Sequence, residues 1–284
     1  MTKLKSLAAL LVLGGAAVLT TPAMAVNYVI YVHGRSAPAT NCGINTSDNN
    51  GNFNSSDSYG SANRSRAVTA GSWRSLFINY DGNSDPRTYG TCRAQTYIQS
   101  ALNTYCKNGN QCVFLCHSAG CMAMDYAFEQ GNASGATGLL YVVNAASASG
   151  GSALASAGAW ATGTGMDNAL KISTARSWNH NNNPVTEYMT AGYACYGATA
   201  CSASVVIGGS DDSAVNFAST CGFSSNGNMT KCVDPNNAKY KSRSTYCNSK
   251  GAKPCNTSNS AYNTDHTGMK CVGRDAFDRL TGNL

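Results

Sequence analysis

The sequence predicts an α/β protein built on a mostly parallel central sheet. Short apolar segments, rich in β-branched and aromatic residues, alternate with longer segments in which apolar residues recur at helical spacing. This alternation is typical of strand–helix–strand units, whose neighbouring strands run parallel. The chain contains no internal repeat, and no linker divides it. We therefore expect one large domain with its own apolar core.

Residues 1–25 are predicted to be a signal peptide. Lys3 and Lys5 precede an apolar run at 7–19, and Ala23-Met24-Ala25 supplies the small-x-small pattern of a cleavage site. The apolar run is too short to span a bilayer core of roughly 30 Å. We therefore expect a secreted or periplasmic protein whose single domain covers 26–284, with no stable membrane anchor.

The expected strands and helices follow from the apolar pattern. The strands are predicted at 26–32, 75–80, 112–116, 139–143 and 204–207. The helices are predicted at 91–106, 120–130 and 273–280. Thr91 is the expected N-cap of the first helix. A polar stretch at 39–70 is predicted to be a functional loop or a partly ordered excursion, and about 151–200 is predicted to hold one helix and a possible cap or lid.

The charge and the cysteines limit the classes of partner. Twenty basic and 14 acidic residues, without a dense basic block, argue against nucleic acid. Thirteen cysteines favour an oxidising compartment. Only four histidines and no paired C-x-x-C framework accompany them, so we expect disulfides, with no metal and no cofactor. The candidate pairs are Cys42–Cys92, Cys106–Cys112, Cys195–Cys201, Cys221–Cys232 and Cys247–Cys255. Spacing does not fix their connectivity, and an odd count leaves at least one thiol unpaired.

The strongest local signal for function is Cys116-His117-Ser118-Ala119-Gly120, between a predicted strand and a predicted helix. A serine in such a sharp turn projects its hydroxyl above the sheet, where the helix N-terminus supplies donors. The pattern is G-x-S-x-G except that Cys116 replaces the first glycine. A helix capped by Ser118 is the alternative interpretation. We expect His117 to pack near the sheet edge.

The residues that would complete a serine-hydrolase site follow Ser118 in the order Ser, Asp, His. His266 is the predicted base, and the acid is Asp211 or Asp212, directly after the strand predicted at 204–207. His180 is a rival base, but it lies in a polar loop before the acid, which is the wrong order.

With these residues in this order, the chain resembles the α/β-hydrolase superfamily, and within it the small secreted lipases and esterases. The resemblance implies a three-layer sandwich, here with disulfides added. It also implies two backbone donors for an oxyanion hole. One is Ala119, after the nucleophile. The other is Arg35, with Ser36 as the alternate, in the loop after the first strand.

The resemblance also bears on the acid and on the reaction. The family acid often appears as G-x-x-D-x-x-V, and residues 209–215 fit this pattern with Asp212 as the acid, which favours it over Asp211. We therefore predict a hydrolase of carboxylic esters that works through an acyl-enzyme on Ser118, with a small-molecule or polymeric ester as substrate. An acyltransferase or amidase with the same triad is one alternative. A non-catalytic binding protein on the same scaffold is another, favoured by Cys116 and the polar stretch at 39–70.

Overall fold

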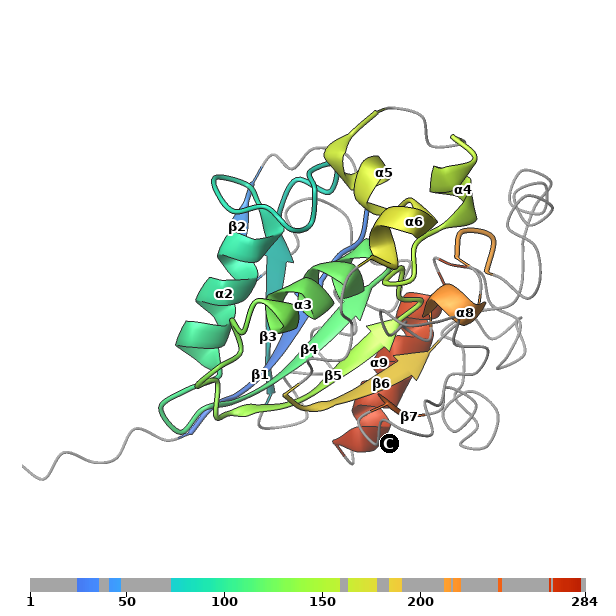
Figure 1. Ribbon diagram of the computed structural model, residues 1–284. Helices are drawn as coiled ribbons and strands as arrows, with labels where there is room; N and C mark the ends of the chain where they lie inside the picture. Colours follow the sequence, from blue (N-terminus) through green and yellow to red (C-terminus); the bar gives the residue numbers. More distant parts are fainter. Residues whose placement is uncertain are drawn as a thin grey trace, which may run out of the picture.

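The computed structural model describes residues 25–35, 41–46, 73–158, 163–177, 184–190, 212–215, 217–220, 240–241, 266 and 268–281. These residues form a seven-stranded sheet of order β2-β3-β1-β4-β5-β6-β7 (Figure 1). The strands are β1 (Asn27–Val32), β2 (Gly43–Asn45), β3 (Trp73–Asn79), β4 (Gln111–His117), β5 (Leu139–Ala145), β6 (Thr186–Thr190) and β7 (Tyr240–Lys241). Every neighbouring pair is parallel except β2 with β3. The predicted mostly parallel sheet is confirmed.

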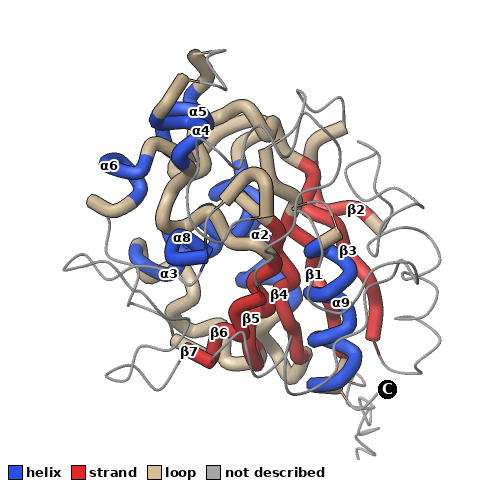
Figure 2. The backbone as a smooth tube through the Cα atoms, turned by 90° about the vertical axis from the view of Figure 1, so that its right-hand side faces the viewer, coloured by secondary structure: helices blue, strands red, loops and turns tan. Residues whose placement is uncertain are grey.

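Helices cover both faces of this sheet. They are α2 (Ala94–Tyr105), α3 (Ala119–Glu129), α4 (Ala153–Ser156), α5 (Gly165–Ala169), α6 (Ile172–Ala175), α8 (Phe217–Thr220) and α9 (Met269–Leu280). Figures 1 and 2 show α2 and α3 on one face and α9 on the other. The predicted three-layer arrangement is therefore confirmed.

The apolar sequence of β1 explains why both faces are covered. Its side chains alternate between two separate cores, as the pleat of a strand requires. Ile30 and Val32 pack in the core under α2 and α3. Val29 and Tyr31 pack in the second core with Phe277 of α9. A strand buried on both faces has a continuous apolar sequence, which is the pattern that predicted it.

The first predicted helix begins later than expected. Helix α2 starts at Ala94 with Arg93 as its N-cap, so the prediction that Thr91 caps it is wrong. The physical reason is local, because Cys92 has a φ of 58° and is bonded to Cys42. The chain therefore turns at Cys92 before the helix can begin. Similarly, α9 begins at Met269 rather than at 273.

The segment predicted as a cap contains a strand of the central sheet. Strand β6 pairs in parallel with β5, so this part of 151–200 is not a cap. Its sequence, T-E-Y-M-T, is too polar to read as a buried strand, but Glu187 is fully buried and accepts a hydrogen bond from Asn144 Nδ2 at 2.5 Å. Figure 1 shows α4, α5 and α6 above the carboxyl ends of β4 and β5. Their role as a lid stays a prediction.

The structure describes part of the polar stretch at 39–70, whereas two other predicted segments lie outside the described residues. The polar stretch at 39–70 contributes the short edge strand β2, which was not predicted. The strand expected at 204–207 and residues 1–24 of the expected signal peptide lie outside the described residues. Within the described parts of the chain, no helix is long and apolar enough to cross a membrane.

The structure contains two of the predicted disulfides. Cys42–Cys92 ties the start of β2 to the turn before α2, and Cys106–Cys112 joins the end of α2 to β4. The other three candidate pairs lie outside the described residues. Cys116 and Cys121 are both buried, and the structure does not join either of them in a disulfide. The described residues contain no group of acidic, histidine or cysteine side chains arranged to hold a metal ion.

Candidate active site

Ser118 forms the turn between β4 and α3, in a backbone conformation that is rare for a residue with a side chain. Its φ is 56° and its ψ is −127°. Such conformations cost about 1–3 kcal/mol and persist where surrounding contacts impose them. Here the Ser118 N–H donates to Ala145 O at 3.0 Å, and its carbonyl accepts from the N–H groups of Cys121 and Ala148 at 3.1 Å each. The hydroxyl makes no capping bond to α3, which argues against a simple N-cap role.

Two glycines allow the backbone to close around this turn. A Cβ atom on Gly34 would lie 2.6 Å from Ser118 Cβ and 3.1 Å from its Oγ. A Cβ atom on Gly120 would lie 2.6 Å from Val32 O. Both positions therefore require glycine. It follows that the loop after β1 lies directly against Ser118, and that the first turn of α3 packs against the end of β1.

Asp212 and His266 are brought together from distant parts of the chain. His266 Nδ1 donates to Asp212 Oδ2 at 2.8 Å, and the His266 backbone N–H donates to Asp212 O at 2.9 Å. The other carboxylate oxygen, Oδ1, accepts from the backbone N–H groups of Ala214 at 3.1 Å and Val215 at 2.8 Å. Asp212 is fully buried, whereas the His266 side chain is 17% exposed. Because Nδ1 carries the donated proton, Nε2 is the ring nitrogen that can accept one.

His117 links the serine turn to His266, a contact that sequence reasoning missed. The two imidazole rings lie 4.7 Å apart between centroids, and His117 Nε2 bonds to the His266 carbonyl at 2.8 Å. Burial lowers the pKa of His117 well below its usual value, and the nearby charges of His266 and Lys270 lower it further. His117 is therefore neutral and donates through Nε2. The partners are 149 residues apart, so no local pattern could have indicated the bond.

The loop after β1 is held from two sides. On one side, the His33 ring stacks on Tyr80 at 4.2 Å, and the Tyr80 hydroxyl donates to the His33 carbonyl at 2.6 Å. On the other side, Arg35 Nε forms a 2.7 Å ion pair with Asp167 of α5, whose side chain is 7% exposed. These contacts hold the backbone of Arg35, which directly follows Gly34, the glycine that packs against Ser118.

The structure describes some of the residues predicted for the site and leaves others outside the described ranges. The structure joins Asp212 to His266 and places His117, the neighbour of Ser118, against that histidine. Ala119 is the first residue of α3, where N–H groups are free of helix partners and the helix dipole favours negative charge. The alternates named from sequence, Asp211, Ser36 and His180, lie outside the described residues.

Comparisons with known proteins support the fold. The sequence matches no protein-family model and no curated protein. The structure is similar to the crystal structure of Bacillus licheniformis lipase BlEst2 in its mature form, with a TM-score of 0.60 and 15% identity over 93% of this chain and 94% of that chain. The propeptide form of the same lipase gives a TM-score of 0.54 and 16% identity, over 71% of this chain and 44% of that longer one.

The chain therefore has the α/β-hydrolase fold. Within that class, it is structurally similar to lipases over most of its length, at an identity low enough that the likeness speaks for the fold alone.

Proposed function

We propose that the protein is a secreted serine hydrolase that cleaves carboxylic esters, with Ser118 as nucleophile, His266 as base and Asp212 as acid. The observation that carries the proposal is the 2.8 Å bond from His266 Nδ1 to Asp212 Oδ2. It joins two residues that sequence order alone had nominated. His117, which precedes Ser118 in the chain, bonds to the carbonyl of the same His266. The bond presents the His266 tautomer that a general base requires.

The proposed reaction proceeds through an acyl-enzyme. Ser118 Oγ attacks the ester carbonyl carbon while His266 Nε2 takes the hydroxyl proton, and Asp212 stabilises the resulting imidazolium. The N–H groups of Ala119 and Arg35 donate to the oxyanion. His266 then protonates the leaving alcohol. Water, deprotonated by His266, attacks the acyl-enzyme, releases the acid and restores Ser118.

Two further observations support the proposal. The fold is one on which lipases are built, so an ester is the substrate class in best agreement with it. The two disulfides support export, because such bonds persist in oxidising compartments. The proposed chemistry uses side chains, backbone donors and water, and it requires no cofactor.

Labelling with a fluorophosphonate probe tests the nucleophile. We expect the probe to modify Ser118, and we expect Ser118→Ala to lower hydrolysis of a p-nitrophenyl ester by roughly 10⁴–10⁶-fold. Ser75→Ala is the matched control, because it removes a buried hydroxyl from β3 of the same sheet. A label on any other residue, or full activity in Ser118→Ala, would overturn the proposal.

A further inference from the structure

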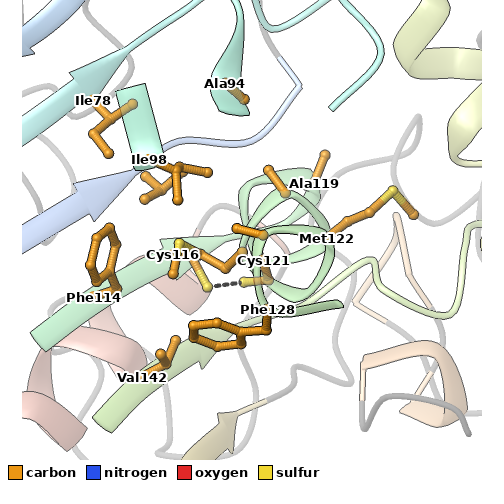
Figure 3. Packing of buried hydrophobic residues seen from close by; sticks show 14 of the residues in the cluster. Ile78, Ala94, Ile98, Phe114, Cys116, Ala119, Cys121, Met122, Phe128 and Val142 are labelled. Atoms are coloured by element: carbon orange, nitrogen blue, oxygen red, sulfur yellow. Dashed lines mark hydrogen bonds between the residues drawn. The ribbon is translucent and has the colours of Figure 1, made fainter. Parts of the chain in front are cut away.

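Two thiols lie on either side of the serine turn. Cys116 occupies the position of the first glycine in G-x-S-x-G, near the end of β4, and Cys121 follows the second glycine, in α3. Their sulfur atoms are 2.6 Å apart, and both residues are fully buried. Figure 3 shows the two sulfurs pointing toward each other between the strand and the helix, among the apolar side chains of the core.

The separation of the sulfurs is too short for two unbonded atoms. Carbon atoms in van der Waals contact lie about 3.5–4.0 Å apart, and sulfur is larger than carbon. A disulfide bond is about 2.05 Å long. The Cys116 and Cys121 sulfurs are therefore closer to bonding distance than to contact distance.

We infer that Cys116 and Cys121 form a disulfide that crosses the nucleophile turn, in addition to Cys42–Cys92 and Cys106–Cys112. The bond closes a ring over residues 116–121, with Ser118 inside it.

The bond forms by thiol–disulfide exchange with a disulfide oxidant, such as oxidised glutathione or an oxidoreductase of the exporting compartment. One cysteine thiolate attacks the oxidant, releases one thiol from it and forms a mixed disulfide. The second cysteine displaces the other thiol. Two protein thiols are thereby oxidised, and one oxidant disulfide is reduced to two thiols.

Burial sets the time at which the bond forms. Desolvation raises the pKa of both the Cys116 and the Cys121 thiol, so the thiolate required for exchange is scarce once the core has closed. The bond therefore forms during folding, and the folded protein then shields it from reductants. The shielding follows from the position of the pair under α3, where no solvent reaches either sulfur.

The bond has a consequence for the turn. A glycine at the first position of the usual motif leaves the backbone free on that side of the serine. Here a covalent link would restrain the chain on both sides of Ser118, which holds a φ of 56°. This consequence rests on the proposed function of Ser118, whereas the existence of the bond does not.

Free thiols at both positions are the competing arrangement. A reduced Cys116 would donate to Asn144 Oδ1, 2.7 Å away, and Asn144 Nδ2 donates in turn to the buried carboxylate of Glu187 at 2.5 Å. The experiment must therefore count thiols rather than measure activity.

Mass spectrometry of the exported protein, purified without reductant, tests the inference. The protein is denatured in N-ethylmaleimide and digested with trypsin without reduction. No lysine or arginine lies between Lys107 and Lys171, so one fragment, 108–171, holds Cys112, Cys116 and Cys121. We expect this fragment, linked to 94–107 through Cys106–Cys112, to carry no maleimide and to be two hydrogen atoms lighter than the dithiol form. Two maleimides on it would overturn the inference.

Single substitutions give an independent count, and they do not require the variants to fold well. Cys116→Ser and Cys121→Ser should each release one thiol, so maleimide on the fragment rises from none to one. The double variant should carry none. If the wild-type protein is a dithiol, the single substitutions lower the count from two to one, which contradicts the inference.

Thermal inactivation, followed by fluorophosphonate labelling, then tests the effect on the turn. We expect the double variant to lose labelling several-fold faster than wild type, and equal rates would remove the proposed restraint. If Ser118 is never labelled, the proposed function fails, while the maleimide count still decides whether the disulfide exists.

Discussion

Substitution of Gly34 by alanine tests the position of the oxyanion loop. The new Cβ atom would lie 2.6 Å from Ser118 Cβ, whereas ordinary van der Waals contact begins at 3.4 Å. The loop must therefore retreat by about 0.8 Å, and a shift near 1 Å is enough to disturb catalytic geometry strongly. Oxyanion donors act at 2.7–3.1 Å, so the retreat removes the Arg35 N–H from its proposed role. Loss of one such donor lowers kcat by about 10²–10³-fold.

The assay compares kcat for a p-nitrophenyl ester with the midpoint of thermal unfolding. Gly138→Ala is the matched control, because its Cβ atom would collide with the Asn110 carbonyl at the start of β5, away from the serine turn. That variant should lose about 1–3 kcal/mol of stability and keep its kcat at 25 °C. Gly34→Ala should instead lose far more kcat than its own loss of stability explains. The proposed role of the Arg35 N–H is refuted if Gly34→Ala keeps kcat within twofold of wild type, or if its loss of kcat only follows the unfolded fraction.

Two other predictions concern Asp212 and His117, which both bond to His266. Asp212→Asn should lower kcat by about 10⁴-fold, because an amide no longer holds the correct tautomer of His266. Asp211→Asn should keep its activity, and the opposite ranking would move the acid to Asp211. Because burial lowers the pKa of His117 well below 6.5, only the unfolded chain gains its proton as the pH falls from about 6.5 toward the folded pKa. His117 is therefore expected to make the free energy of unfolding fall by up to about 1.4 kcal/mol per pH unit in that window. Urea titrations between pH 7 and 5 should show a smaller pH dependence for His117→Gln, and parallel curves for the two proteins would contradict this.

Several features of the protein could be predicted from local sequence. The apolar runs at 26–32 and 112–116 indicated the buried strands β1 and β4, since a strand covered on both faces needs a continuous apolar sequence. The serine between a strand and a helix indicated the turn, because small residues around it allow the sharp bend. The disulfide over residues 106–112 was a candidate because its loop is short. Each of these features depends on residues close together in the chain.

Other features depended on the tertiary structure. Strand β6 was not predicted, because its polar sequence is typical of an exposed segment. In the structure, its Glu187 is paired with Asn144 of β5 instead of facing water. The contact of His117 with His266 could not be predicted for a related reason, since the 149 residues between them carry no signal of their proximity. Sequence order nominated His266, but only the fold brings its ring to Asp212.

The sequence by itself determined the class of fold, the serine turn and the residue types that follow it in order. Periodicity and turn chemistry express these features within a few residues, so they can be read before the chain is folded. Only the tertiary structure decided which side chains meet. The end of β4 lies beside a residue that precedes α9, and this packing places His117 against His266, 149 residues further along the chain.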